Sequence, residues 1–256
     1  MKLLKWTALL LVGAYFLVAT LAYAFQNRLI FHPRLIDADA TFDWGQETFV
    51  KTEDGDSLSL VWVDNPGDEV VLYLHGNVGD ANRGRHQVRR LIDESDYDVV
   101  VADYRGYGKS SGTLRDDSQL LSDAQAMYDA VAAHYPESKI RVLGYSLGTG
   151  MATYLAAENR PAHLTLVAPY TSLVDMKNQA FWWLPNFLLN YRLDTRSRIA
   201  DVRCPIDIYH GTADRLIPFE MAEELARLSP KQATLHPLEG GSHRGAILAF
   251  EEGWVE

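Results

Sequence analysis

The chain has 256 residues, of which 47% are hydrophobic, and a formal net charge of −10. This length fits one large α/β domain, or one domain with an added segment, and the acidic balance argues against nonspecific binding to nucleic acid. The single cysteine, Cys204, excludes an internal disulfide framework and a cysteine-based zinc site.

The N-terminal part of the chain reads as a membrane segment. Residues 6–25 form an almost uncharged run that follows Lys2 and Lys5. A helix of about twenty apolar residues is long enough to cross a bilayer. We therefore expect residues 1–25 to be a membrane anchor and residues 26–256 to be a globular domain.

Two other interpretations of this run remain open. A cleaved signal peptide would use the small residues Ala22 and Ala24, but the run exceeds the roughly 7–15 residues of a usual signal core. A buried core helix is disfavoured because the run has no polar face. The early lysines favour a cytoplasmic N-terminus and a globular domain on the non-cytoplasmic side, although Arg28 and Arg34 weaken this bias.

Strand and helix patterns alternate after a connector at residues 27–43. The expected strands are an antiparallel hairpin over residues 47–63 and apolar runs at 70–74, 97–102, 140–143, 164–167, 206–209 and 234–235. The expected helices cover residues 83–92, 117–134, 219–228 and 244–252, with a further one opening at residue 151. This alternation predicts a mainly parallel sheet with helices on both faces.

The sequence Gly144-Tyr145-Ser146-Leu147-Gly148 stands between an apolar strand and an alanine-rich helical pattern. In this context Gly-x-Ser-x-Gly places a serine hydroxyl at a sharp, strained turn above the end of a sheet. The flanking glycines allow the close backbone approach that such a turn needs. An ordinary serine in a glycine-bearing turn is the simpler interpretation of the motif alone.

A serine nucleophile needs a base within hydrogen-bond reach and a third group that holds the base. In a parallel sheet these partners gather at the carboxyl ends of strands. Asp214 and His243 follow the last two predicted strands, and the order Ser146, Asp214, His243 is that of this architecture. We expect Ser146 to attack an acyl carbonyl, His243 to move the proton and Asp214 to hold the imidazole.

Other residues compete for these two roles. The alternative histidines are His75, His210 and His236. The first two begin loops that they would brace, and His236 lies inside the last strand. Asp175 is the main alternative acid; Asp103 ends a strand upstream of Ser146, and Asp207 lies within a strand.

The tetrahedral intermediate of acyl transfer needs hydrogen-bond donors already in place for its oxyanion. The backbone N–H of Leu147, directly after the nucleophile, is one expected donor. The loop that follows residues 70–74 supplies the other, for which we choose the N–H of Asn77. A plain tight turn is the alternative interpretation of this loop.

The sequence has neither a complete phosphate-binding loop nor a metal-binding motif. The stretch Gly106-Tyr107-Gly108-Lys109-Ser110 ends like a phosphate loop, but Asp103 occupies the required earlier glycine position. We interpret it as a structural turn. No His-Glu-x-x-His or comparable metal spacing occurs. We therefore expect no cofactor and no metal.

Taken together, the chain resembles the α/β-hydrolase-fold serine hydrolases. More narrowly it is similar to the group anchored by one N-terminal membrane helix, which includes lysophospholipases, acyl-protein thioesterases and many bacterial proteins of unassigned substrate. The resemblance covers roughly residues 26–250. It rests on His75-Gly76-Asn77, residues 103–108, residues 144–148, residues 168–172, Cys204-Pro205, residues 210–214 and Gly241-Ser242-His243.

The resemblance implies an eight-stranded sheet whose second strand is antiparallel, and a short cap at about residues 170–199. Val78 departs from the pattern, because many relatives have alanine there, and this puts the pocket near the oxyanion site in doubt. In the cap, Trp182, Trp183 and Phe187 are expected either to pack over the sheet edge or to form an apolar lip for an acyl chain; such aromatic residues also suit a membrane interface.

The sequence thus predicts a membrane-anchored serine hydrolase that cleaves carboxylic ester or thioester bonds of lipid-like or other acyl substrates through an acyl-enzyme. One alternative is a peptidase of the same fold, although the short cap leaves no room for a large gating domain. The other is an inactive hydrolase fold that serves as a membrane-tethered binding protein. One fold hosts many chemistries, so the substrate stays open.

Overall fold

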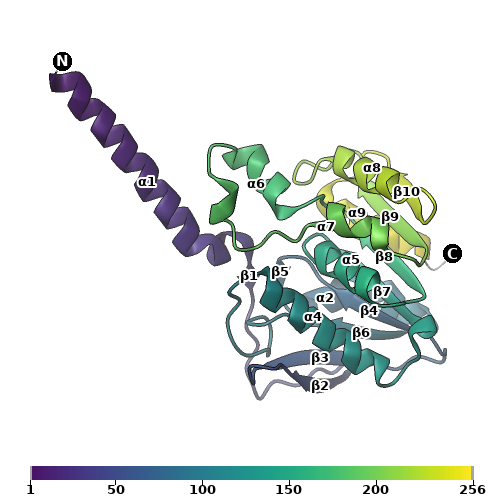
Figure 1. The fold of residues 1–256 in the computed structure, drawn as a ribbon. Coiled ribbons are helices and arrows are strands. Elements are labelled where there is room, and N and C mark those ends of the chain that lie inside the picture. The colour runs from purple at the N-terminus through teal and green to yellow at the C-terminus, as the bar shows by residue number, and fades with distance from the viewer. Residues whose placement is uncertain (1, 255–256) are drawn as a thin grey trace.

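The main sheet has eight strands within residues 2–254, the part of the chain that the computed structural model describes (Figure 1). In chain order they are β2 (Gln46–Lys51), β3 (Ser57–Val63), β4 (Val70–Leu74), β6 (Asp98–Ala102), β7 (Ile140–Tyr145), β8 (His163–Val167), β9 (Ile206–Gly211) and β10 (Ala233–Leu238). Across the sheet the order is β10-β9-β8-β7-β4-β6-β3-β2.

The direction of these strands confirms the predicted fold class. The second of the eight strands, β3, is antiparallel to both of its neighbours, and the other pairs are parallel. The apolar runs at β4 and β6 are buried along their whole length, as strands covered on both faces are. The β2–β3 hairpin forms one edge of the sheet, where most side chains of β2 face solvent and only Glu47 and Val50 are partly buried.

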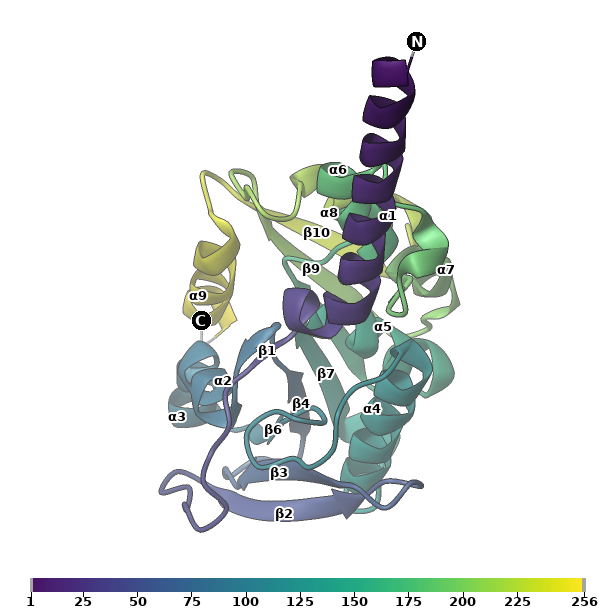
Figure 2. The ribbon, with the colours of Figure 1, turned by 90° about the vertical axis from the view of Figure 1, so that its left-hand side faces the viewer.

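Helices cover both faces of the sheet (Figure 2). One face carries α4 (Asp117–Ala132), α5 (Gly148–Glu158), α7 (Thr195–Arg198) and α8 (Phe219–Leu228); the other carries α2 (Ala81–Gln87), α3 (Arg89–Glu94) and α9 (His243–Trp254). The remaining elements are α1 (Lys2–Ile30), α6 (Leu173–Phe181) and the short 3₁₀ turns η1 (Glu137–Lys139), η2 (Asn186–Leu188) and η3 (Ile199–Asp201).

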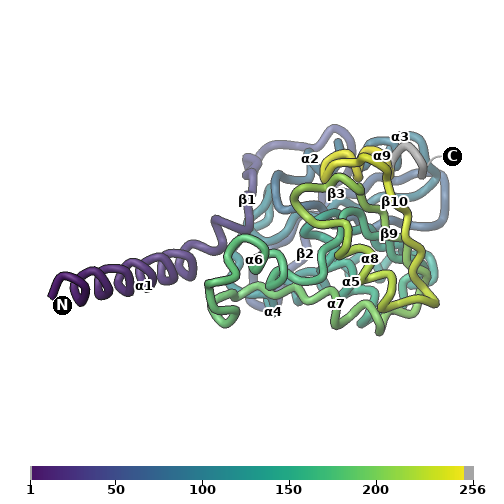
Figure 3. The backbone as a smooth tube through the Cα atoms, turned by 90° about the horizontal axis from the view of Figure 1, so that it is seen from above, coloured from purple at the N-terminus to yellow at the C-terminus, as the bar shows by residue number. Residues whose placement is uncertain are grey.

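Helix α1 projects away from the globular body (Figure 3). It is long and apolar enough to cross a membrane, with a mean hydropathy of 2.1 in its most apolar window. Its last turn leads into β1 (His32–Pro33), which pairs in parallel with β5 (Val78–Gly79) in a separate two-stranded sheet. The end of the apolar helix is thereby joined to the loop that follows β4.

Three predicted boundaries differ from the structure. The helix of residues 6–25 continues through residue 30, because Gln26 and Asn27 hydrogen-bond to the body while they stay helical. The single helix over 83–92 is two helices that break at Val88, whose backbone leaves the helical region, and the first begins at residue 81 because Asp80 caps it. The strand expected at residues 234–235 is longer, because β10 runs from residue 233 to residue 238. It includes Pro237, which an edge strand tolerates.

The turn at residues 103–108 has a structural role, as the sequence indicates. Arg105 is 2% exposed, and its guanidinium donates two hydrogen bonds to Asp123, at 2.8 and 2.7 Å, from the side of α4. It also donates to Asp54 in the β2–β3 turn. This network fixes the end of β6 to the hairpin and to α4.

Candidate active site

Ser146 lies at the turn between β7 and α5 with a left-handed φ of 51°. That conformation costs energy for a non-glycine residue and turns the side chain out of the sheet. Cβ atoms are excluded on both sides of it. A Cβ on Gly148 would stand 2.0 Å from the carbonyl oxygen of Leu74, and one on Gly144 would stand 2.7 Å from the Cβ of Ala152. The two glycines are therefore needed for the close packing of α5 against the strand ends.

The structure brings Ser146, His243 and Asp214 together from three strand ends. His243 Nε2 lies 3.0 Å from Ser146 Oγ, and His243 Nδ1 lies 2.7 Å from Asp214 Oδ2. Ser146 and Asp214 are buried, whereas the His243 side chain is 19% exposed. This arrangement gives the hydroxyl a base and gives the base an orienting carboxylate, which is what nucleophilic catalysis by serine requires.

The Asp214 carboxylate is held in place by more than His243. Its Oδ1 accepts hydrogen bonds from the backbone N–H groups of Leu216 and Ile217, at 2.8 and 3.0 Å. His210 Nε2 lies 3.4 Å from Oδ2. Burial by itself would raise the pKa of Asp214, but the hydrogen bonds from His210, His243 and Ile217 outweigh burial and hold this pKa well below its usual range. The carboxylate is thus charged at neutral pH and fixed in direction.

Tyr145 supports the imidazole from the other side. Its ring stacks on His243 with the centroids 5.4 Å apart, and its hydroxyl donates to the His243 carbonyl oxygen at 3.3 Å. Burial, with the charge of Asp214, raises the pKa of Tyr145 to about 12, so the hydroxyl keeps its proton. Sequence reasoning did not assign this residue a role, because the second position of Gly-x-Ser-x-Gly gives no signal of its orientation.

Two backbone N–H groups are candidate donors to an oxyanion. Within residues 2–254, neither the N–H of Leu147 nor that of Asn77 has a hydrogen-bond acceptor. Leu147 follows Ser146 directly, and its carbonyl oxygen accepts from the Tyr170 hydroxyl at 3.1 Å. These are the two donors expected from the sequence.

The Asn77 backbone is held by the end of α1 and by β1. Its side-chain amide donates to the carbonyl oxygen of Ile30 at 3.0 Å. Its own carbonyl oxygen accepts from the N–H of His32 at 2.9 Å and from the Tyr107 hydroxyl at 2.8 Å. No sequence signal indicated that the apolar helix and the loop after β4 are bonded to each other.

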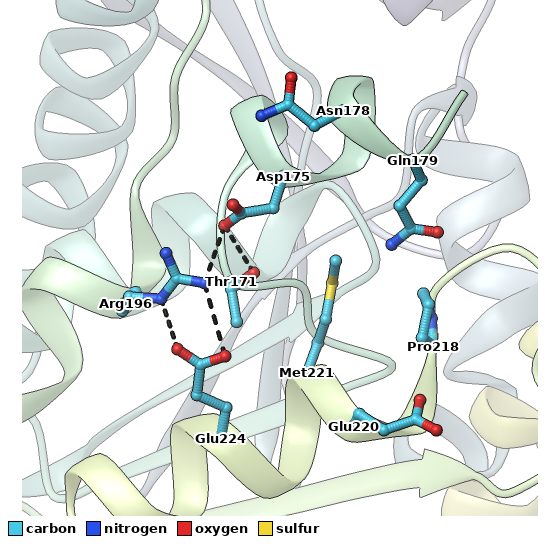
Figure 4. Close-up of a pocket in the computed structure, with 9 residues that line it drawn as sticks. All are labelled: Thr171, Asp175, Asn178, Gln179, Arg196, Pro218, Glu220, Met221 and Glu224. Atoms are coloured by element: carbon cyan, nitrogen blue, oxygen red, sulfur yellow. Dashed lines mark hydrogen bonds and ion pairs between the residues drawn. The ribbon is translucent and has the colours of Figure 1, made fainter. Parts of the chain in front are cut away.

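The alternative acids have other partners. Asp175, at the first turn of α6, accepts hydrogen bonds from Thr171 and Ser172 and forms an ion pair with Arg196 at 3.1 Å. Figure 4 shows this pair, with Glu224 on the other side of the guanidinium, in the pocket between α6 and α8. Asp175 therefore links α6, through Arg196, to Glu224 of α8.

The other candidates also have structural partners. Asp207 lies between His163 and His236, whose Nε2 atoms stand 2.8 and 2.7 Å from its two oxygens. His75 and Asp103 form a buried pair, 3.3 Å apart, beneath the Asn77 loop. Among the described residues, no hydrogen bond or ion pair joins Asp207, His236, His75 or Asp103 to Ser146.

The segment from α6 to η2, within the expected cap of about residues 170–199, lies beside α1, and a groove of about 570 Å³ separates the two; we call it the α1–cap groove. Its lining is almost wholly apolar and includes Phe25 and Ile30 from α1 and Leu173, Met176 and Trp183 from the cap. Tyr15 donates a hydrogen bond to the Trp183 carbonyl oxygen, and Gln26 bonds to Leu188 and Asn190 across the same junction.

The three aromatic residues predicted for the cap are placed differently. Trp183, which is 38% exposed, lies on the wall of the groove. Trp182 and Phe187 are 76% and 75% exposed and lie outside the groove. In the described part of the chain, no set of three histidine, cysteine, aspartate or glutamate residues is placed to hold a metal ion.

Known proteins resemble this chain at several levels. A family model described as the α/β hydrolase fold matches residues 69–198. An uncharacterized protein of Mycobacterium tuberculosis is 30% identical over 93% of this chain and 89% of its own length. The lysophosphatidylserine lipase of Danio rerio is 28% identical over 65% of this chain, which matches only 49% of that lipase.

Solved structures agree on the architecture. An esterase of Pyrococcus furiosus superposes with a TM-score of 0.69, over 88% of this chain and 95% of its own, at 23% identity. An esterase of Exiguobacterium antarcticum superposes with a TM-score of 0.61, over 81% of this chain and all of its own, at 20% identity. At these identities the likeness establishes the shared fold.

Proposed function

The chain belongs to the α/β-hydrolase fold family, and from this premise we propose that it is a serine hydrolase that cleaves carboxylic ester or thioester bonds of lipid-like acyl substrates through an acyl-enzyme on Ser146. The observation that carries the proposal is the relay of Ser146, His243 and Asp214, with contacts of 3.0 and 2.7 Å. The lipase and esterase relatives support ester hydrolysis as the chemistry.

The relay implies the direction of proton transfer. With Nδ1–H of His243 donated to Asp214, Nε2 has a free lone pair and accepts the Ser146 hydroxyl proton as Oγ bonds to the acyl carbon. The imidazolium then protonates the oxygen or sulfur of the leaving group, and the acyl group stays on Oγ. A water molecule then gives a proton to the same nitrogen as its oxygen bonds to the acyl carbon. The imidazolium returns this proton to Oγ as the bond between Oγ and the acyl carbon breaks, which releases the carboxylic acid and restores Ser146.

The oxyanion of each tetrahedral intermediate would be stabilised by the N–H groups of Leu147 and Asn77. Both donors are free of other acceptors among the described residues, and both are fixed by bonds to their own carbonyl groups or side chains. One preorganised donor of this kind lowers a barrier by roughly 2.7–4 kcal/mol. This loop and the turn after Ser146 therefore provide the electrostatic part of the proposed catalysis.

The α1–cap groove supports an acyl substrate. Its volume of about 570 Å³ lies within the range of small-molecule sites, roughly 300–1,000 Å³, and its walls are apolar. Both walls of the groove begin next to the site. On the α1 wall, the Ile30 carbonyl oxygen accepts a hydrogen bond from the Asn77 amide. The other wall starts with α6, which follows β8, and the Val167 carbonyl oxygen at the end of β8 accepts from the Ser146 N–H. We place the acyl chain in this groove, with Trp183 on its wall.

We further propose that residues 1–25 anchor the chain in a membrane, with the catalytic domain of residues 26–256 on the non-cytoplasmic side and a cap at about residues 170–199. The apolar length of α1 and its exposed side chains support the anchor. Apart from the bond of Tyr15 to Trp183, the polar bonds from the described helix to the catalytic body lie within residues 26–30, next to this boundary. The exposed Trp182 and Phe187 would then meet the membrane interface.

Labelling with a fluorophosphonate probe tests the chemistry. The full chain in detergent is expected to be labelled, and Ser146→Ala is expected to lose labelling and hydrolysis of nitrophenyl esters together. Ser118→Ala, an exposed serine on α4, is the matched control and should keep both. A folded wild-type chain that takes no label would instead support the membrane-tethered binding protein. A labelled chain that cleaves peptides but no esters would support the peptidase.

Acyl length tests the groove. The wild type is expected to prefer long-chain to short-chain nitrophenyl esters, and Trp183→Ala to lose much of this preference. Trp182→Ala is a matched control, because it removes the neighbouring indole outside the groove. A steady fall in rate with acyl length that neither substitution changes would contradict the placement of the chain in the groove.

A further inference from the structure

The loop that follows β4 is held along its carbonyl oxygens. Three successive oxygens, at residues 75, 76 and 77, each meet a polar side chain that is 1% exposed or less. The Tyr104 hydroxyl donates to the first at 2.5 Å, His75 Nδ1 lies 2.7 Å from the second, and the Tyr107 hydroxyl donates to the third at 2.8 Å. The backbone around Asn77 is thus fixed from the interior of the body.

The second of these contacts acts on the peptide group that carries the Asn77 N–H. In a planar trans peptide the carbonyl oxygen of Gly76 and the N–H of Asn77 point in opposite directions. A donor held on the oxygen therefore fixes the direction of the N–H. It also polarises the peptide group, which strengthens the N–H as a donor by about 10–30%. This peptide lies next to the nucleophile, because a Cβ on Gly76 would stand 3.6 Å from the Cβ of Ser146.

The His75 imidazole is itself held at both ring nitrogens. A carbonyl oxygen only accepts, so the Nδ1 atom that faces Gly76 carries a proton. The other nitrogen, Nε2, lies 3.3 Å from Oδ1 of Asp103, which is fully buried. The ring also packs against Tyr104 and Tyr107, whose centroids are 4.4 and 5.4 Å away. The donor on the Gly76 oxygen therefore keeps one direction.

The second expected oxyanion donor has the same kind of support. The N–H of Leu147 shares its peptide group with the carbonyl oxygen of Ser146. The Thr149 side chain is fully buried, and its hydroxyl donates to this oxygen at 2.6 Å, beside the Thr149 N–H at 3.0 Å. Both expected donors thus have a buried polar side chain on the carbonyl oxygen of their own peptide group.

We propose that His75 and Thr149 are positioning residues of the oxyanion site, each of which sets the direction and the strength of one backbone N–H through the carbonyl oxygen of the same peptide group. The inference rests on the proposed function, because it concerns the donors that would stabilise the tetrahedral intermediate. Neither side chain touches the substrate. Their effect should therefore appear in the transition state and leave substrate binding unchanged.

Thr149→Val tests the Leu147 donor, because it keeps the shape of the side chain and removes the hydroxyl. With a short-chain nitrophenyl ester, kcat is expected to fall about tenfold, less than the roughly 10²–10³-fold loss of an entire donor, while KM stays within about twofold. Thr153→Val is the matched control. The Thr153 hydroxyl is also buried on α5 and donates at 2.8 Å to the Thr149 carbonyl oxygen, whose peptide group carries no oxyanion donor. It should keep the wild-type kcat.

The His75 variants are made with Asp103→Asn, so that no buried carboxylate loses its partner, and they are compared with Asp103→Asn alone. His75→Leu removes the donor and should lower kcat about tenfold at unchanged KM. His75→Asn places an amide N–H close to the position of Nδ1 and should restore kcat to within about threefold of the Asp103→Asn chain. A trifluoromethyl ketone, which forms a tetrahedral oxyanion on the serine, should lose affinity by the same factor as kcat falls.

Three outcomes would overturn the proposal. These are an unchanged kcat in both Thr149→Val and the His75→Leu chain, an equal loss in Thr153→Val, or a loss of kcat with unchanged affinity for the ketone. Thermal unfolding identifies a variant that fails to fold, and the Thr149 and Thr153 comparison decides alone if a His75 variant does so. Failure of the proposed function is distinct, because the wild-type chain would then cleave no nitrophenyl ester and take no fluorophosphonate label.

Discussion

Replacement of Asp214 by asparagine tests the assignment of the catalytic relay most directly. The backbone N–H groups of Leu216 and Ile217 need an acceptor at 2.8 and 3.0 Å, so the asparagine oxygen should take the place of Oδ1. Its NH₂ group then faces Nδ1 of His243, where Oδ2 stood at 2.7 Å. The imidazole must accept there and carry its proton on Nε2.

With the proton on Nε2, the imidazole presents a donor to Ser146 and cannot act as a base. A comparable change of tautomer in a serine protease lowers kcat by about 10⁴-fold, which corresponds to about 5 kcal/mol in the barrier. We expect a loss of this size in kcat/KM for a short-chain nitrophenyl ester. The fold should persist, because the backbone bonds to the loop remain.

Asp207→Asn provides the matched control for this experiment. Asp207 also bonds two histidines, His163 and His236, but it contacts neither Ser146 nor His243. Its activity should stay within about twofold of wild type, and thermal unfolding of both variants separates folding from catalysis. Retention of more than about a tenth of the wild-type kcat/KM by Asp214→Asn would refute the assignment of the acid.

Three further substitutions test how the fold supports the site. Arg105→Leu leaves Asp123 buried without its partner and should lower the free energy of unfolding in urea by about 3–5 kcal/mol. A change below about 1 kcal/mol would show that the pair stabilises the fold no more than an exposed ion pair does. Gly148→Ala forces a Cβ to 2.0 Å from a carbonyl oxygen at the end of β4 and should cost about 1–3 kcal/mol, with a loss of ester hydrolysis. Gly13→Ala, with open space at its Cβ, should change neither. Hydrogen bonds from two histidines lower the pKa of Asp207 in the folded chain. The stability that the ionised carboxylate contributes is therefore fully present above about pH 3.9, the pKa of an unfolded carboxyl group. It is lost as the pH falls through the lower pKa of the folded state. The stability gap between wild type and Asp207→Asn should therefore close on acidification below that pH, and a gap that widens there would contradict the ion-pair explanation.

Much of the architecture could be predicted from local patterns. Strands such as β4 and β6 are buried on both faces, so their sequences are continuous apolar runs that differ visibly from the amphipathic pattern of α4. The turn at Ser146 was recognisable because it constrains residue size on both sides: only glycine fits at 144 and 148. Steric limits of this kind leave a mark in the sequence.

Contacts between distant elements leave no such mark. The bond from Asn77 to Ile30 joins an asparagine amide to a backbone carbonyl oxygen, and any residue at position 30 offers that oxygen. The different placement of Trp182 and Trp183 depends on how the cap lies against α1, and neighbouring identical residues give no hint of it. The cavity lined by Arg34, Arg83 and Arg244 likewise gathers residues that follow β1 or lie in α2 and α9, which are far apart in the chain.

The bonds between the end of α1 and the Asn77 loop have a consequence for any soluble fragment of this protein. A protease that cut after residue 30 would release a body that keeps the sheet, the relay and β1. The Asn77 amide would lose its acceptor at Ile30, and β1 would lie next to a new chain end. We expect such shedding to weaken turnover instead of liberating an active enzyme. On this view, residues 30–33 both connect the catalytic body to the bilayer and hold the Asn77 loop in the position that catalysis needs.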